Sequence, residues 1–214
     1  MNSGVLEGLR TAVLGYDAQA ASDYATQAVA NCVDPLEALQ VMTVAIREVG
    51  DRFGRGELWL PDLVGAADAM QAAMPVVEAE IQRQGKQRIS LGTVVAGTVF
   101  GDIHSIGISI VVALARAEGF TVVDLGVDVT AEQFVDAVID GKADLLAMSA
   151  LLTTTAYEQK RVIDALTRQG MRDKVKVVVG GGAITEEFAQ SIGADGYAPT
   201  APLAADLFRK LLAH

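Results

Sequence analysis

The sequence predicts two parts of different class: an α-helical part and an α/β part, the latter a five-stranded, doubly wound parallel sheet of the flavodoxin-like kind. Two observations carry this prediction. The first 86 residues contain one helical pattern after another, and beyond them short apolar runs alternate with helical patterns. Strands that are apolar throughout, each followed by a helix, indicate a parallel sheet covered on both faces. We therefore place a four-helix bundle in residues 1–86 and a Rossmann-like domain in residues 87–214.

The helical part carries recognisable start signals. Asp17 precedes an alanine-rich segment, Asp34-Pro35 puts an N-cap before a proline at the first helical position, and Pro61-Asp62 opens the longest segment. Pro75 lies inside that segment and predicts a kink or a break near Ala73. Apolar residues recur in it at steps of four and three and form one stripe, made of Leu63, Ala67, Met70, Met74, Val77 and Ile81.

The α/β part alternates five predicted strands with helices. The strands are expected within residues 89–98, 120–126, 143–149, 174–181 and 196–198. The helices are expected within residues 105–119, 130–141, 154–170, 185–193 and in the last segment up to the C-terminus. Ligands of such sheets bind beyond the carboxyl ends of the strands, where the strand order reverses. The loops after the first, third and fourth strands are therefore the candidate site.

The composition excludes several classes of function. Hydrophobic residues make up 51% of the 214 residues and charged residues 21%, which is typical of a folded globular protein. With 17 basic and 27 acidic residues the net charge is −10, and no cluster of Lys and Arg is present, so a nucleic-acid partner is not expected. The single Cys32 cannot form an internal disulfide, the N-terminal segment lacks a signal-peptide pattern, and no apolar run reaches the roughly 18 residues that span a bilayer. We expect a cytoplasmic protein without a membrane span.

The loop after the first strand, Gly101–Gly107, carries the candidate metal ligand. It contains His104, with Asp102 two positions earlier. An aspartate that accepts the second ring N–H of a histidine fixes its tautomer and raises its basicity, as at metal-binding histidines. One histidine and a distant Cys32 cannot supply the ligands of a zinc site, so a metal would have to arrive inside a cofactor. The alternative is a hydrogen-bonded histidine with a purely structural role.

Two further loops carry candidate ligand-binding residues. The loop after the third strand, Ser149–Thr155, holds four hydroxyl side chains, of which one is expected to cap the next helix and the others to bind a ligand or water. The loop after the fourth strand begins Gly180-Gly181-Gly182, and glycine lets the backbone approach a ligand closely. A glycine run after a strand is also ordinary turn chemistry, so neither loop identifies a ligand by itself.

Taken together, the loops resemble the signature of cobalamin-binding domains. The pattern is Asp102-x-His104-x-x-Gly107, then 41 residues, Ser149-x-Leu151, then 28 residues, and Gly180-Gly181. The segment GDRFGRGELWLPDLVGAADAM of the helical part resembles the cap of corrinoid proteins that serve methanol and methylamine methyltransferases, and of the module of cobalamin-dependent methionine synthase. The resemblance covers nearly the whole chain.

This resemblance implies that the chain binds cobalamin, as methylcobalamin or another cobamide, with its lower base displaced and His104 on the cobalt. Asp102 and Thr155 would form a proton-linked relay with His104 and make up the catalytic group. Ser149 and Leu151 would line the channel of the displaced nucleotide tail, and Gly180, Gly181 and Gly182 would form the turn that lets the tail pass close to the backbone. The other expected cofactor-binding residues are Gly101, Ile103, Ser105, Ile106, Gly107 and Thr153. One departure from the pattern is Thr200, at a position where relatives often carry an acidic residue.

The resemblance also assigns a role to the helical part. As a cap it would cover the upper face of the corrin, with Met70, Met74 and Val77 as the candidate covering surface. The alternative is that these residues form the core of the bundle itself. A cap must move aside to admit partner enzymes, so a flexible joint is expected near Gly85–Arg88.

The function implied is that of a corrinoid methyl-carrier subunit of a multicomponent methyltransferase, not a complete enzyme alone. It would accept a methyl group from a substrate-specific methyltransferase and pass it to a second, acceptor methyltransferase, with a reductive activation protein as a further partner. Three other readings stay open. They are a cobalamin-binding regulator or sensor, the small subunit of a cobalamin-dependent mutase, and a flavodoxin-like domain without cobalt in which His104 is structural.

Overall fold

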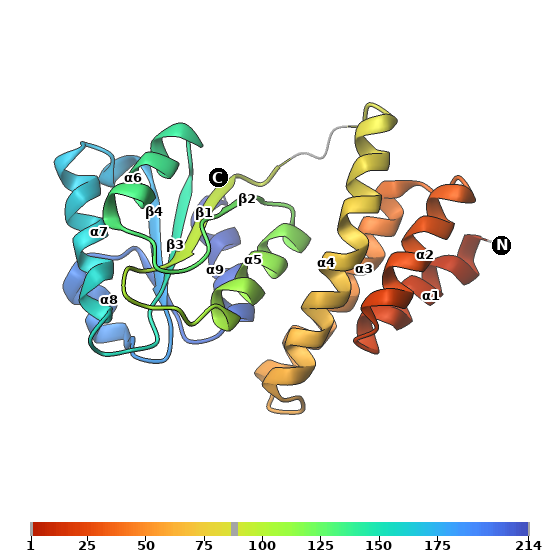
Figure 1. Cartoon of the computed structure of the whole chain (residues 1–214), viewed down its shortest axis with the longest axis horizontal. Coiled ribbons are helices and arrows are strands. Elements are labelled where there is room, and N and C mark those ends of the chain that lie inside the picture. Colours follow the sequence, from red (N-terminus) through yellow and green to blue (C-terminus); the bar gives the residue numbers. More distant parts are fainter. Residues whose placement is uncertain (1, 87–89, 214) are drawn as a thin grey trace. The chain divides into compact units, whose positions relative to one another are not determined.

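The chain folds as two units, residues 1–89 and 90–214, which the computed structural model describes over residues 2–86 and 90–213 (Figure 1). The boundary between the units lies three residues beyond the predicted boundary at residue 86. Of the predicted flexible joint, Gln87 and Arg88 lie outside the described residues. Each unit is described by itself below.

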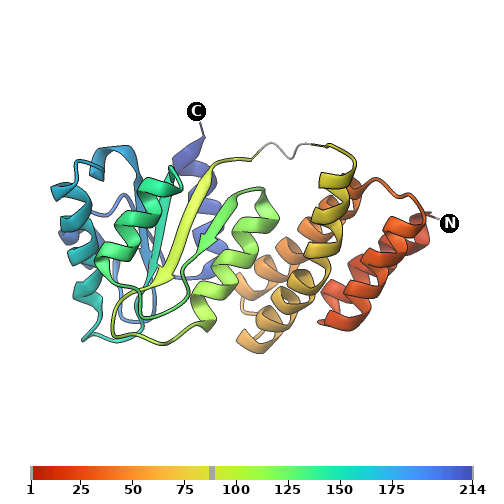
Figure 2. The ribbon, with the colours of Figure 1, turned by 45° about the horizontal axis from the view of Figure 1, so that its top comes forward.

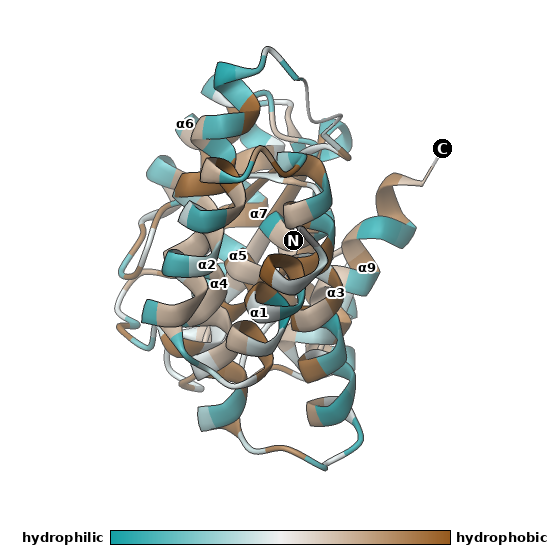
Figure 3. Cartoon of the chain, turned by 90° about the vertical axis from the view of Figure 1, so that its right-hand side faces the viewer, coloured by the Kyte–Doolittle hydropathy of each residue, from teal (hydrophilic) through white to brown (hydrophobic). Residues whose placement is uncertain are grey.

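The helical unit contains four helices. They are α1 (Asn2–Leu14), α2 (Ala18–Ala30), α3 (Pro35–Gly54) and α4 (Leu60–Arg83). Asp17 and Asp34 are N-caps as predicted, since their side chains accept the backbone N–H of Ala20 and Leu36, both at 2.9 Å. At the start of α4, Asp62 acts from inside the helix and accepts the N–H of Trp59 at 2.7 Å. Hydrophilic and hydrophobic segments alternate along these helices, as Figure 3 shows for α3.

A kink or a break was expected near Ala73, and the break is absent because helix α4 continues through Pro75. A proline inside a helix removes one backbone hydrogen bond and crowds the preceding turn. Ten residues of α4 are buried, between Leu63 and Ile81, on both sides of the proline. Because tertiary burial of one face contributes most of a helix's stability in a protein, this packing outweighs the local cost.

The second unit is a five-stranded parallel sheet with the strand order β2-β1-β3-β4-β5. Its strands are β1 (Thr93–Thr98), β2 (Thr121–Asp124), β3 (Leu145–Ser149), β4 (Lys176–Gly180) and β5 (Gly196–Ala198), each within a predicted range. The order reverses between β1 and β3, which is where doubly wound sheets bind ligands. The predicted fold class is confirmed.

Helices cover both faces of the sheet, as Figure 2 shows in a turned view. Helices α5 (Ile106–Glu118) and α9 (Ala201–Leu212) pack on one face through the core that contains Phe120 and Phe208. Helices α6 (Ala131–Asp140), α7 (Ala156–Arg168) and α8 (Glu186–Ile192) pack on the other face around Phe134. A short 3-10 turn, Arg172–Lys174, precedes β4.

The last row of the sheet on the α5/α9 face consists of small residues. Thr98 pairs with Ser149, Ser149 with Gly180, and Gly180 with Ala198. Alternate residues of a strand share a face, and residues two positions earlier in β1, β3 and β4 lie in the core under α5 and α9. This edge of the sheet therefore carries little side-chain volume beside the loop of His104.

Candidate functional site

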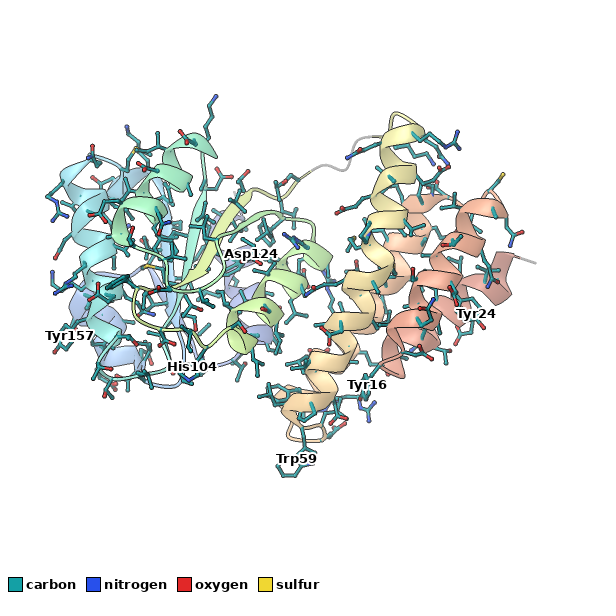
Figure 4. The ribbon with its side chains drawn as sticks, in the orientation of Figure 1. Tyr16, Tyr24, Trp59, His104, Asp124 and Tyr157 are labelled. Carbon is teal, nitrogen blue, oxygen red and sulfur yellow. The ribbon has the colours of Figure 1, made fainter. Side chains whose placement is uncertain are left out.

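His104 lies in the loop between β1 and α5, at the carboxyl end of the sheet (Figure 4). Its Nδ1 is 2.7 Å from Oδ1 of Asp102. The histidine side chain is 46% exposed, whereas that of Asp102 is completely buried. An ionised carboxylate only accepts hydrogen bonds, so Nδ1 of the neutral imidazole carries the proton and Nε2 carries the lone pair. In the neutral ring, Nε2 is therefore the nitrogen that can bind a metal.

Asp102 is held by donors from two separate loops. Its Oδ1 also accepts the backbone N–H of His104 at 3.1 Å. Its Oδ2 accepts the N–H of Leu151 at 2.7 Å, the N–H of Leu152 at 3.3 Å and the hydroxyl of Thr155 at 2.8 Å. Burial raises the pKa of this carboxyl. The hydrogen bonds from His104, Thr155 and Leu151 together lower it by more than burial raises it, so the pKa lies well below its ordinary value. Asp102 is therefore ionised at neutral pH.

The structure thus brings Asp102, His104 and Thr155 into one hydrogen-bonded chain. Thr155 occupies the N-cap position of α7, yet its side chain makes no capping hydrogen bond. Its hydroxyl lies 2.8 Å from Oδ2 of Asp102 and 3.0 Å from the carbonyl oxygen of Leu152, and donation to the ionised carboxylate is the stronger of these two hydrogen bonds. The expectation that a hydroxyl of this loop caps the next helix is wrong for the residue at that position.

Exposed apolar side chains surround this chain of residues. Of the predicted residues, Ile103 is 74% exposed, Ile106 54% and Leu151 45%. Phe100 and Leu152, which the sequence reasoning missed, are 50% and 41% exposed. Large apolar side chains gathered at one edge of a fold mark a ligand or partner surface. Phe100 and Leu152 could have been found from the sequence, because both are large apolar residues next to the motif residues.

The glycines of the motifs fall into two groups. A Cβ on Gly180 would lie 2.7 Å from the Ala198 carbonyl oxygen, and one on Gly181 would lie 2.1 Å from that of Ala150. The packing of the chain itself requires these two glycines. This agrees with the alternative stated from the sequence, that a glycine run after a strand belongs to an ordinary turn. A Cβ on Gly107 would meet nothing within 4 Å, so no neighbour in the chain requires a glycine there. Gly107 is exposed in the first turn of α5.

Gly182, Ser105 and Thr153 are the remaining predicted site residues. A Cβ on Gly182 would lie 2.8 Å from the side chain of Leu151, in the loop that binds Asp102. Ser105 is the N-cap of α5, without a capping hydrogen bond from its side chain. Thr153 is exposed in the loop between β3 and α7.

Two buried polar atoms of this unit lack hydrogen-bond partners among the described residues. They are Oε1 of Gln159 and Oγ1 of Thr200. Nε2 of Gln159 donates to the carbonyl oxygens of Met148 and Gly180, at 3.2 and 3.1 Å, and so ties together the ends of β3 and β4. Thr200 follows β5 at the same edge of the sheet. Both are candidate polar contacts for a ligand of this edge.

Three residues of interest lie in the helical unit. Met70 and Met74 of α4 are 1% and 6% exposed. Their burial agrees with a place in a hydrophobic core, and a covering role remains a prediction. Trp59, which the sequence reasoning missed, is 79% exposed and projects from the turn between α3 and α4 in Figure 4.

Comparison with known proteins defines the class. A family model described as a B12 binding domain matches residues 92–205, and a second model with the same description matches residues 5–78. These ranges contain every motif residue and the α4 methionines. The chain is therefore a two-part B12-binding protein, and Nε2 of His104, on a half-exposed ring whose Nδ1 is bound to Asp102, fits the cobalt of that cofactor.

Relatives then identify the family. The chain is 41% identical over 198 residues to the trimethylamine corrinoid protein of Methanosarcina barkeri, covering 92% of this chain and 91% of the relative. It is 39% identical over 214 residues to a corrinoid protein of Desulfitobacterium hafniense (strain Y51), covering 99% of each. The structure of the methanol:cobalamin methyltransferase complex MtaBC from Methanosarcina barkeri matches with a TM-score of 0.82 at 31% identity, covering 98% of this chain and 80% of that one. The chain belongs to the corrinoid proteins of the methylamine and methanol methyltransferase systems.

Membership of this family decides between the hypotheses with and without a cobalt cofactor. The cofactor is a cobamide with its cobalt, so the flavodoxin-like reading without cobalt is wrong. In the described ranges, 2–86 and 90–213, no group of three or more His, Cys, Asp and Glu side chains could hold a metal ion. The cobalt is part of the cobamide that the B12-binding match and the corrinoid relatives indicate. No described helix is both long and apolar enough to cross a membrane.

Proposed function

We propose that this chain is a methyl carrier in which His104 binds the cobalt of the corrin from below, with the lower base of the cofactor displaced. The observation that carries the proposal is the 2.7 Å contact between Nδ1 of His104 and the buried carboxylate of Asp102. That contact leaves Nε2 as the metal-binding atom on a half-exposed ring. When bound, the corrin supplies a cobalt centre that accepts and releases a methyl group.

In this proposal the chain's own residues control the imidazole. Asp102 holds the ring in one tautomer and raises its basicity, and Thr155 holds Asp102. Protonation of Nε2 would release the imidazole from the metal, since only the neutral ring binds one. The three residues thus form a relay that couples proton uptake to ligation.

The displaced nucleotide tail would lie along the small residues at the end of the sheet. Support comes from the row of Thr98, Ser149 and Gly180 on one face, which carries little side-chain volume. We place Met70 and Met74 of the helical unit over the upper face of the corrin. Support for that role is the second B12-binding match, which spans both methionines.

The proposed partners are a substrate-specific methyltransferase, a second methyltransferase that accepts the methyl group, and a reductive activation protein. The first is supported by the solved complex of a similar chain with a methanol:cobalamin methyltransferase. The others follow from the carrier role: the group taken up must be delivered, and an oxidised cobalt must be reduced again. The specificity for the methyl donor would reside in the first partner.

The test is methyl uptake by the reconstituted chain. Cobalamin-loaded protein is incubated with trimethylamine, dimethylamine, monomethylamine or methanol carrying a labelled methyl group, each with its own methyltransferase. We expect label on the wild type with one donor and on Arg161→Ala, whose guanidinium lies on the exposed side of α7. His104→Ala is expected to lose most of this uptake. Equal labelling of His104→Ala and wild type, or no labelling with any donor, contradicts the proposal.

A further inference from the structure

The loop of His104 is also held from the side opposite to Thr155, by the segment 125–130 that follows β2. Thr98 donates its N–H to the carbonyl oxygen of Gly126 at 2.9 Å and accepts the N–H of Val129 at 3.0 Å. An isolated bridge joins Val99 to Val129. The motif of the cofactor site contains no residue of this segment, so nothing described so far assigns it a role.

The loop begins with a tight turn whose conformation sets the direction of the residues after it. The N–H of Asp102 donates to the carbonyl oxygen of Val99 at 3.1 Å, and the third residue of the turn, Gly101, has a φ of +78°. A positive φ at this position is the mark of a type II turn. In a type I turn the peptide between Phe100 and Gly101 would be rotated by roughly 150°, and the N–H of Gly101 would point the other way.

Asp128 binds that N–H. Its Oδ1 accepts the N–H of Gly101 at 2.7 Å, and its own N–H donates to the carbonyl oxygen of Asp102 at 3.0 Å. Asp128 therefore holds the peptide group before Gly101 and the peptide group after Asp102, and Asp102 lies two residues before His104. It does so with a φ of +57°, a left-handed conformation that L residues other than Asn and Asp rarely adopt.

We propose that Asp128 is a positioning residue for the cobalt ligand: its carboxylate selects the type II turn at Val99–Asp102, and the turn aims the imidazole of His104 at the metal. This inference rests on the ligation proposed above. Asp128 is exposed, and among the described residues no hydrogen bond joins it to His104 or to the buried carboxylate of Asp102. It acts through the backbone of the turn.

Three variants distinguish the effect of the Asp128 carboxylate from the effect of its left-handed backbone conformation. Asp128→Gly keeps the left-handed conformation and the N–H, and removes the acceptor of the Gly101 N–H. Asp128→Asn keeps a side-chain oxygen and tolerates the same φ. Asp124→Ala is the matched control, because Asp124 accepts the N–H of Gly126 at 2.9 Å within the same segment. That control removes a carboxylate–glycine bond that involves neither Gly101 nor Asp102.

The measurement is the fraction of cobalt(II) bound to a protein imidazole, from electron spin resonance of cobalamin-loaded protein. We expect Asp128→Gly to lower the ratio of bound to unbound imidazole roughly tenfold, as for the loss of one charge-assisted hydrogen bond, while Asp128→Asn recovers most of it. Asp124→Ala is expected to match the wild type. In the cofactor-free protein, amide exchange of Gly101 should accelerate in Asp128→Gly and not in Asp124→Ala.

The outcomes are distinguishable. If the wild type shows imidazole on the cobalt and Asp128→Gly shows the same fraction, the role of Asp128 is refuted and the ligation stands. An equal loss in Asp128→Gly and Asp124→Ala also refutes it, because the effect then belongs to the segment and not to the carboxylate. If the wild type shows no protein imidazole on the cobalt, both the ligation and the role of Asp128 fall.

Discussion

Replacing Thr155 by valine tests how tightly the buried carboxylate of Asp102 depends on its donors. The two side chains have nearly the same shape, so the substitution removes the hydroxyl and little else. That hydroxyl donates to Oδ2 at 2.8 Å, and both residues are buried, at 7% and 0% exposed. A hydrogen bond to a charged group contributes about 1.5–3 kcal/mol, and water cannot replace a donor at a buried site. We expect Thr155→Val to lower the free energy of unfolding of the α/β unit by that amount.

The assay is urea unfolding of the cofactor-free protein. Because the only tryptophan, Trp59, lies in the helical unit, its fluorescence follows that unit, while circular dichroism follows both. The expected loss corresponds to a shift of about 1 M urea in the midpoint of the α/β unit. Thr154→Val is the control: it removes an exposed hydroxyl from the same loop and should change stability by less than about 0.5 kcal/mol. Equal midpoints for the two variants would refute the reasoning.

Three further predictions concern the same two units. Since the pKa of Asp102 is lowered in the folded state, its contribution to stability is present above the unfolded pKa of roughly 3.9 and is lost as the pH falls toward the folded pKa. Acid titration of Asp102→Asn should therefore show a weaker loss of stability below pH 4 than wild type does; an unchanged curve contradicts this. Gly107→Val should leave the cofactor-free fold intact, because a Cβ there meets nothing within 4 Å, yet weaken cobalamin binding in a titration; unchanged affinity would show that no ligand uses this space. Pro75→Ala should raise the thermal midpoint of the helical unit, because it restores a backbone hydrogen bond inside α4; a lower midpoint would show that the proline ring is needed for packing.

The sequence predicted the fold of both units because their strongest signals are periodic. Apolar runs bounded by glycine and polar residues marked all five strands, and Asp17 and Asp34 marked two helix starts by the local chemistry of capping. Of the kink or break expected near Ala73, the break does not occur, because the rule for proline is local whereas the helix is stabilised by contacts that the local sequence does not contain.

The site was predictable only as far as its motif extends. Asp102, His104 and Thr155 were expected together, and the structure places them within hydrogen-bond distance. One of the four hydroxyls of the loop 149–155 was expected to cap the next helix, because capping is a local rule, whereas the partner of the Thr155 hydroxyl lies 53 positions away in the sequence. Asp128 was missed for the same reason: its partner Gly101 is 27 positions away, and the contact is visible only once β1 and β2 lie side by side.

The central claim is that Nε2 of His104 donates its lone pair to the cobalt of the corrin. The most direct measurement is electron spin resonance of the cobalt(II) protein prepared once with ordinary histidine and once with ¹⁵N-labelled histidine. We expect a three-line splitting from one nitrogen, which becomes a two-line splitting in the labelled protein and disappears in His104→Ala. A three-line splitting that persists in the labelled protein would place the cofactor's own base on the metal and would contradict ligation by His104.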